Sequence, residues 1–130
     1  MARLPLGQLF VVGFQGTEVP ASARSLVQSH AVSGFLLFKR NIESGEQVVA
    51  LPTQIFELGT AGSSSSPLLV SVDQEGGRVA RLRGIATDVP AMRIVGKAAA
   101  GDKDLPYRLG AMMARELVTL GFHWDFAPVV

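Results

Sequence analysis

Apolar residues gather in four short runs along the chain. The runs cover residues 9–14 (LFVVGF), 34–38 (GFLLF), 68–72 (LLVSV) and 122–130 (FHWDFAPVV). Their length and their content of β-branched and aromatic residues favour β-strands. The apolar residues within each run are continuous rather than alternating, as in the strands of a parallel sheet that is covered by helices. The pattern therefore predicts four parallel strands.

Helical patterns fill two of the gaps between these runs. Residues 20–30 place Ala21, Leu26 and Val27 on one side of a predicted helix. Residues 44–58 repeat apolar side chains at helical intervals, namely at Val48, Leu51, Ile55 and Leu58. Ser44 and Gln47 have the spacing of a capping box at the start of this second helix. Pro52 lies inside it and is expected to kink the helix or to delay its start.

A third helix precedes the last strand. Asp104 is the expected N-cap, Pro106 lies in the first turn, and Gly121 ends the helix. Its apolar face runs from Leu105 to Leu120 through Leu109, Met112, Met113 and Leu117. Residues 59–67 and most of residues 74–104 have the composition of loops, the latter with short helical turns.

The order strand, helix, strand, helix, strand, loop, helix, strand predicts an α/β fold with right-handed crossovers. Two architectures fit this order. One is a small open sheet, and the other is half of an eight-stranded barrel, which needs about 250 residues. The chain has 130 residues. A sheet that ends on a buried type of strand leaves an edge open to pairing, which favours the half-barrel.

Composition removes several classes of function. Hydrophobic residues make up 48% of the chain and charged residues 18%, so a packed core is expected and disorder is not. The net charge of +1 argues against nucleic acid as a partner. Without cysteine there is no disulfide, thiolate nucleophile or cysteine zinc site, and two distant histidines predict no metal site. No apolar run approaches the ~18 residues of a membrane span, and the start does not resemble an export signal, so a cytoplasmic location is expected.

The candidate chemistry lies at residues 70–84, VSVDQEGGRVARLRG. Asp73 ends a predicted strand, where functional side chains gather in parallel α/β folds. Its carboxylate can accept hydrogen bonds from sugar hydroxyls or bind a metal, or it can serve as a helix cap or pair with an arginine. Glu75 lies within the turn, where a pair with Arg78 is the simpler role. Gly76 and Gly77 permit a tight turn, and no phosphate-binding lysine follows them.

Three arginines follow the turn. Arg78, Arg81 and Arg83 each carry five donors, which suit carboxylate, phosphate or neighbouring hydroxyl groups. Solvation at the surface is the simpler explanation for one or two of them. No aromatic residues alternate with them, which gives little support to nucleic-acid binding.

Two further polar groups lie at strand ends. Lys39, Arg40 and Asn41 end the second predicted strand, where a functional role and a buried brace between arginine and a carboxylate are equally compatible with the sequence. His123 and Asp125 share one face near the start of the last predicted strand, which favours buried polar packing over catalysis.

GFLLFKRNI, LLVSVDQEGGRVARLR and GFHWDFAPVV occur in this order over nearly the whole chain. In these motifs the chain resembles the N-terminal half of glycoside hydrolase family 3. The most similar branch is that of the bacterial β-N-acetylhexosaminidases that act in peptidoglycan recycling. The DQEGGRVARL motif is the most specific of the three.

The resemblance implies a (β/α)₈ barrel, of which residues 1–130 supply the first four strands. It also implies that Asp73 and Arg81 bind the hydroxyls of N-acetylglucosamine, with no cofactor and no metal. The family's acid/base residues and its aspartate nucleophile come later in the barrel, so no catalytic residue is expected within this chain. The implied activity is release of terminal β-linked N-acetylglucosamine from peptidoglycan-derived glycans. The alternatives are a β-glucosidase of the same family and a non-catalytic half-barrel that binds sugar or a partner.

Overall fold

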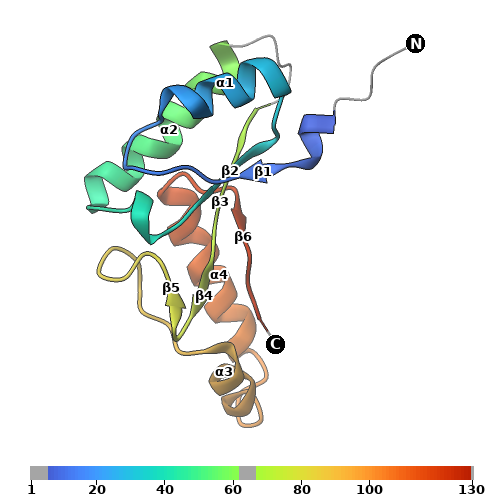
Figure 1. Ribbon diagram of the computed structural model, residues 1–130. Coiled ribbons are helices and arrows are strands. Elements are labelled where there is room, and N and C mark those ends of the chain that lie inside the picture. The colour runs from blue at the N-terminus through green and yellow to red at the C-terminus, as the bar shows by residue number, and fades with distance from the viewer. Residues whose placement is uncertain (1–5, 62–66, 130) are drawn as a thin grey trace.

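The computed structural model describes residues 6–61 and 67–129, and its centre is a four-stranded parallel sheet (Figure 1). The strands lie in the order β1-β2-β3-β6 and comprise β1 (Val11–Val12), β2 (Gly34–Leu37), β3 (Leu69–Val72) and β6 (Trp124–Asp125). The four predicted parallel strands are therefore confirmed.

The two edge strands are shorter than their apolar runs. Residues 9–14 were expected to form one strand, yet only Val11 and Val12 pair, and a 3₁₀ helix (η1, Leu6–Leu9) precedes them. Residues 122–130 contribute only Trp124 and Asp125. A run of apolar residues indicates that a segment is buried, whereas a strand also needs a neighbouring strand to pair with. Each of these two strands pairs on one side only.

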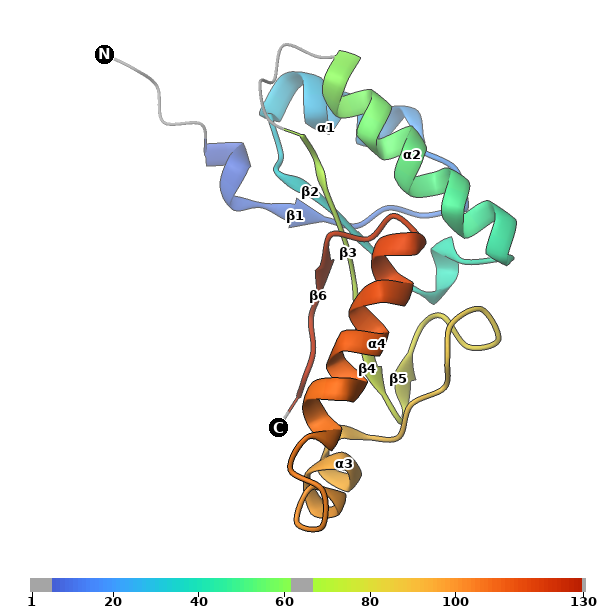
Figure 2. The same cartoon turned by 180° about the vertical axis from the view of Figure 1, so that it is seen from behind.

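Strand pairing divides the sheet into two unlike faces. Phe35 pairs with Val70 and Leu37 with Val72, and all four side chains are fully buried. They belong to one core with apolar residues of the helices, among them Val27, Val48, Leu51, Ile55 and Leu117. Val11, Leu69 and Trp124 lie on the other face, where between 37% and 56% of each residue remains exposed. The helices of the described segments therefore cover one face and leave the other uncovered, which Figures 1 and 2 show from opposite sides.

Three helices follow the sequence pattern. They are α1 (Ala21–His30), α2 (Gly45–Ala61) and α4 (Leu105–Thr119). α2 begins at Gly45 and runs through Pro52, so the proline does not delay its start. The helix also extends three residues into the predicted loop of residues 59–67, of which residues 62–66 lie outside the described residues.

The helix ends agree with the sequence at Ser44 and Gly121 but not at Asp104. The Ser44 hydroxyl accepts a hydrogen bond from the Gln47 backbone at 3.2 Å, although the Gln47 side chain caps Glu43 rather than Ser44. Gly121 ends α4 with a positive φ of 86°. Asp104 precedes α4 as predicted, but its side chain makes no capping bond because its own backbone is already helical. Asp102 instead accepts the Asp104 N–H at 3.1 Å.

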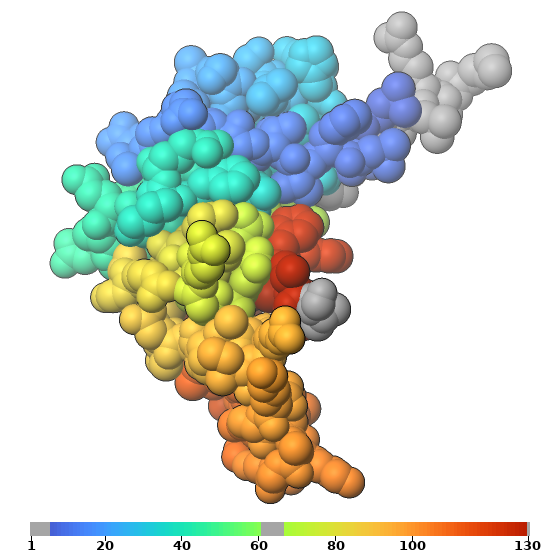
Figure 3. Space-filling model, turned by 60° about the horizontal axis from the view of Figure 1, so that its bottom comes forward, coloured from blue at the N-terminus to red at the C-terminus, as the bar shows by residue number. Residues whose placement is uncertain are grey.

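Residues 74–104 contain more regular structure than their composition predicted. β4 (Gln74–Gly76) and β5 (Val79–Ala80) form an antiparallel hairpin, and α3 (Met92–Ala98) follows. The hairpin register shifts between Gln74 and Gly76, which breaks the alternation by which hairpins are recognised in sequences. Figure 3 shows this hairpin in yellow between the residues near 40, in teal, and the orange segment of α3.

The hairpin turn requires its two glycines. Gly76 and Gly77 both have positive φ, at 81° and 59°. A Cβ on Gly76 would lie 2.6 Å from the Pro90 carbonyl oxygen, and one on Gly77 would lie 2.7 Å from the Ala91 Cβ. The turn therefore packs directly against the backbone of residues 89–91.

We expect Gly76→Ala to destabilise the fold more than Gly84→Ala does. Gly84 also has a positive φ, of 75°, but a Cβ there would meet nothing within 4 Å. Gly84→Ala should therefore lose only the conformational term of roughly 1–2 kcal/mol, and Gly76→Ala should add a steric clash to it. Urea unfolding of both variants measures the difference, and equal losses would show that the turn is not packed as described.

Candidate functional site

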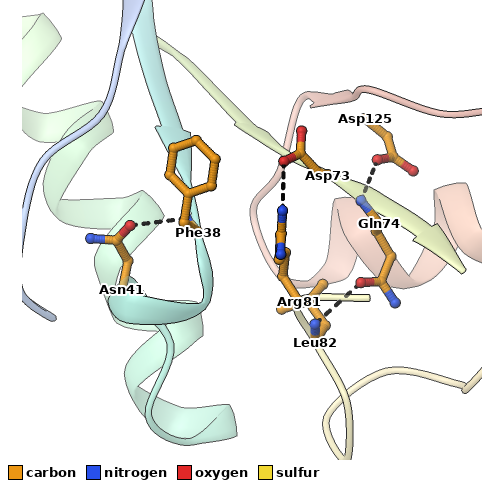
Figure 4. A network of polar contacts seen from close by, with 7 residues as sticks. All are labelled: Phe38, Asn41, Asp73, Gln74, Arg81, Leu82 and Asp125. Atoms are coloured by element: carbon orange, nitrogen blue, oxygen red, sulfur yellow. Dashed lines mark hydrogen bonds and ion pairs between the residues drawn. The ribbon is translucent and has the colours of Figure 1, made fainter. Parts of the chain in front are cut away.

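The candidate site lies at the carboxyl end of the parallel sheet. Asp73 directly follows β3, and Arg81 directly follows β5, at the return of the hairpin. The Arg81 Nη2 lies 3.1 Å from the Asp73 Oδ2, and the two side chains are 29% and 19% exposed (Figure 4). The hairpin thus brings together two residues that lie eight positions apart in the sequence, and they form an ion pair. The structure brings together the two residues that sequence analysis selected, and it also realises the simpler alternative of a carboxylate paired with an arginine.

The guanidinium group of Arg81 is only partly satisfied. Its Nε atom is buried and has no hydrogen-bond partner within the described part of the chain. A buried donor without a partner costs about 1–3 kcal/mol. Asp73 supplies acceptors and Arg81 supplies donors. A sugar hydroxyl can therefore donate to Asp73 and accept from Arg81 at the same time.

An aromatic ring adjoins the pair. The Arg81 guanidinium carbon lies 5.8 Å from the centroid of the Phe38 ring, and that of Arg40 lies 4.4 Å from the same ring. These distances are within the range of cation–π attraction. Phe38, which directly follows β2, therefore lies beside the Asp73–Arg81 pair.

Asn41 fixes the position of this aromatic residue. Its buried amide donates to the carbonyl oxygens of Phe14 and Gly16 at 3.1 and 2.7 Å, while its Oδ1 accepts the Phe38 N–H at 2.9 Å. The Arg40 Nε also donates to the Phe14 carbonyl, at 3.0 Å. Of the two interpretations of this segment, the buried contact between an arginine and a carboxylate is wrong, because the acceptor of Arg40 is a backbone carbonyl. Lys39 is exposed.

Gln74 and Asp125 belong to the surroundings of the site. The sequence gives no indication of a role for Gln74, and it predicts that Asp125 is a buried packing residue. The Gln74 backbone N–H donates to the Asp125 Oδ1 at 2.9 Å, and the Leu82 N–H donates to the Gln74 Oε1 at 3.2 Å. Because β6 consists of two residues only, Asp125 ends that strand rather than lying near its start. Its pairing with Val72 places it one residue before Asp73 in register.

Asp125 has a perturbed pKa. Partial burial raises the pKa of its carboxyl above 3.8, the hydrogen bond from Gln74 opposes this change, and the negative charges of Asp73 and Glu75 add to it. His123, which was expected to be buried with Asp125, is exposed. Its Nδ1 accepts the Val70 N–H at 3.1 Å.

The remaining charged residues of the motif serve the turn or face solvent. Arg83 donates to the Gly77 carbonyl and lies 3.4 Å from Asp88, so it supports the hairpin turn. Arg78 is exposed, and the expected pair between Glu75 and Arg78 does not form in residues 67–129. Among the described residues, no three histidine, aspartate or glutamate side chains gather as metal ligands. No helix in these segments is long and apolar enough to cross a bilayer.

Comparison with known proteins identifies the family. The model of the glycosyl hydrolase family 3 N-terminal domain matches residues 1–130. The chain belongs to glycosyl hydrolase family 3. The β-hexosaminidase of Alkalilimnicola ehrlichii is 40% identical to this family 3 chain, over 96% of the chain and 35% of the relative. That of Stenotrophomonas maltophilia is 38% identical, over 94% of the chain and 36% of the relative. The chain therefore spans about a third of the length of these relatives.

Solved structures agree with this assignment. A family 3 β-N-acetylglucosaminidase from a Paenibacillus species superposes with a TM-score of 0.87 at 38% identity, over 95% of this chain and 23% of the other. NagZ from Neisseria gonorrhoeae, in a complex with N-trifluoroacetyl-D-glucosamine, superposes with a TM-score of 0.78 at 27% identity, over 91% and 34%. The α/β fold of this family 3 chain is thus that of the family's N-terminal barrel domain, as expected.

We expect Asp125→Asn to stabilise the family 3 chain at neutral pH. The raised pKa means that the folded state holds the Asp125 proton more tightly than the unfolded state does, so ionisation destabilises the fold. This penalty is complete above the folded pKa and disappears as the pH falls below 3.8, the ordinary pKa of the group. The asparagine keeps an oxygen that accepts the Gln74 N–H.

Thermal or urea unfolding at pH 7 and at successively lower pH tests this expectation. The gain from Asp125→Asn should shrink with acidification. Asp102→Asn is the matched control, because Arg108 lowers the pKa of the Asp102 carboxyl and the sign is reversed. A loss of stability at pH 7 from Asp125→Asn would contradict the account of this carboxyl.

Proposed function

We propose that residues 1–130 form the sugar-binding, N-terminal half of a (β/α)₈ barrel that releases terminal β-linked N-acetylglucosamine from glycans. In this proposal Asp73 and Arg81 bind hydroxyl groups of the sugar. The observation that carries it is the partly exposed Asp73–Arg81 pair at the carboxyl end of the sheet.

The geometry suits a hydroxyl ligand. Only the Oδ2 of Asp73 contacts Arg81, which leaves its Oδ1 as an acceptor for a sugar O–H. The same hydroxyl oxygen, or a neighbouring one, can accept from the free donors of Arg81. Bonds of this charge-assisted kind contribute about 1.5–3 kcal/mol each. Two of them fix the orientation of the ring, and orientation supplies a large part of enzymatic rate enhancement.

The proposal assigns binding, not bond cleavage, to these residues. Retaining glycosidases use two acid groups about 5–5.5 Å apart on opposite sides of the bond. Asp73 is engaged by Arg81, and Asp125 lies on the helix-covered face of the sheet, paired in register with Val72. The relatives are about three times as long as this chain, which supports placing the acid/base and the nucleophile in a further part of the barrel.

The names of the relatives support an N-acetylated substrate over a glucoside. Curated relatives are β-hexosaminidases, and similar solved structures are β-N-acetylglucosaminidases. A peptidoglycan-derived glycan as the natural substrate and a cytoplasmic location stay predictions of the sequence. A non-catalytic half-barrel is a second candidate, and the exposed apolar face of the sheet favours it because a partner could cover that face.

We expect Asp73→Asn to lower kcat/KM about 100-fold for a chromogenic β-N-acetylglucosaminide, in the protein as its gene encodes it. The amide keeps the shape of the side chain but loses the charge that strengthens both the ion pair and the bond to a hydroxyl. A 100-fold loss corresponds to about 2.7 kcal/mol. Steady-state kinetics with purified variants measure it.

Asp102→Asn is the matched control for this experiment. Asp102 also pairs with an arginine, with its Oδ2 at 2.7 Å from the Arg108 Nη2, but the pair is exposed and precedes α4. Exposed pairs contribute little, so this variant should retain activity. Full activity in Asp73→Asn would show that Asp73 does not bind the substrate.

We also expect the same protein to hydrolyse the N-acetylglucosaminide faster than the matching β-glucoside. Intact mass and the two assays on one preparation separate the candidates. Equal or greater turnover of the glucoside would point to a β-glucosidase. A mass of 13.8 kDa with sugar binding and no turnover would favour the non-catalytic half-barrel.

A further inference from the structure

Gln74 is a buried amide directly behind the proposed sugar site. Only 3% of the residue is exposed, which is uncommon for glutamine. It directly follows Asp73 in the chain, and its side chain points to the opposite side of the strand, toward the return of the hairpin (Figure 4). A polar side chain in such a place needs hydrogen bonds to balance the cost of its burial.

Its hydrogen bonds link both ends of the hairpin. The Gln74 Oε1 accepts the Leu82 N–H at 3.2 Å in a buried environment. This N–H belongs to the peptide unit that joins Arg81 to Leu82, so the bond fixes the backbone immediately after Arg81. On the other side, the Gln74 N–H donates to the Asp125 Oδ1 at 2.9 Å, which holds the backbone immediately after Asp73 to β6. One residue thus secures the backbone next to both members of the ion pair.

The hairpin itself provides few other restraints on Arg81. Its ladder joins only Gln74 with Ala80 and Gly76 with Val79, with an irregular register between them. A two-stranded hairpin of this size is marginally stable in water by itself. The side-chain bond from Gln74 to Leu82 therefore extends the connection one step past the ladder, to the point where Arg81 leaves it.

We propose that Gln74 is a positioning residue for sugar binding, which holds the Arg81 guanidinium against Asp73 through the Leu82 N–H. The inference rests on the proposed function of the Asp73–Arg81 pair. Asp125 contributes by anchoring the Gln74 backbone to β6. Gln74 touches no sugar in this proposal and acts only through Arg81.

A double-mutant cycle tests the proposal. Gln74→Met keeps the approximate volume of the side chain and removes the acceptor. We expect it to weaken binding of N-acetylglucosamine three- to tenfold, the equivalent of one neutral hydrogen bond, when affinity is measured by calorimetry on the protein as its gene encodes it. In an Arg81→Ala background the same substitution should change affinity no further, because the residue through which it acts is gone.

Two further variants separate positioning from general damage to the fold. Ser71→Ala removes another buried hydrogen bond of β3, from the Ser71 hydroxyl to the Phe35 carbonyl at 3.1 Å, and it should leave affinity unchanged. Gln74→Glu keeps an acceptor in the same place and should bind sugar more tightly than Gln74→Met. If Gln74→Met does not fold, Gln74→Glu still tests the proposal. A folded Gln74→Glu variant that loses as much binding as Arg81→Ala would contradict it.

The outcomes distinguish this inference from the proposed function. If Arg81→Ala itself leaves affinity unchanged, the sugar site is wrong and the role of Gln74 falls with it. If Arg81→Ala weakens binding but Gln74→Met does not, only the positioning role is overturned. Equal losses from Gln74→Met in both backgrounds would also overturn it, because the effect would not pass through Arg81. Hydrogen exchange of the Leu82 amide gives an independent reading, and it should accelerate in Gln74→Met and not in Ser71→Ala.

Discussion

The parallel pairing of β2 with β3 is the constraint on which the rest of the structure depends. Four consecutive residue pairs join the strands, from Gly34 with Leu69 to Leu37 with Val72. The strands approach so closely that a Cβ on Gly34 would overlap the Leu69 carbonyl oxygen. The pairing aligns four fully buried apolar side chains on one face, and each contributes about 1.5–3 kcal/mol by its burial. It also brings Phe38 and Asp73, which follow the two strands, to the same edge of the sheet, where Arg81 joins them.

The two faces of the sheet differ in a way that fits a barrel. Helices α1, α2 and α4 supply the apolar partners of one face. On the other face Val11, Leu69, Trp124 and Phe126 line an apolar pocket of about 110 Å³ and remain partly exposed. In the proposed barrel this second face is the interior, which side chains from all strands fill in layers.

The parts of the fold that sequence could predict are those set by local pattern. The buried strands at 34–38 and 68–72 and the helix ended by Gly121 were clear because apolar spacing and glycine placement carry their signal. Asp73 could be selected because the end of a parallel strand is a recurrent place for chemistry. The choice of Arg81 among three arginines came from resemblance to the family, and the structure adds the contact that distinguishes it, the ion pair with Asp73.

The remaining features depend on contacts between distant segments. Asp125 was placed in buried packing because the length of β6 is set by its partner β3 and not by its own apolar run. The hairpin has the composition of a loop, because its two glycines are required by the close approach of the backbone of residues 89–91. Asp104 has the residue type and position of an N-cap, but its backbone is helical and its side chain makes no capping bond. The sequence carries no signal for Gln74, since a glutamine is ordinarily exposed and its hydrogen bonds depend on the positions of Leu82 and Asp125.

The most direct test of the central claim is to follow the arginine Nε–H resonances by NMR while N-acetylglucosamine is added. The Arg81 side chain is 29% exposed beside Asp73, so a sugar bound to this pair should shift the resonance of the Arg81 Nε–H. The Arg108 Nε–H should not respond, because that side chain pairs with Asp102 away from the site. A titration that saturates without changing the Arg81 signal would contradict the assignment of Asp73 and Arg81 as the residues that hold the sugar.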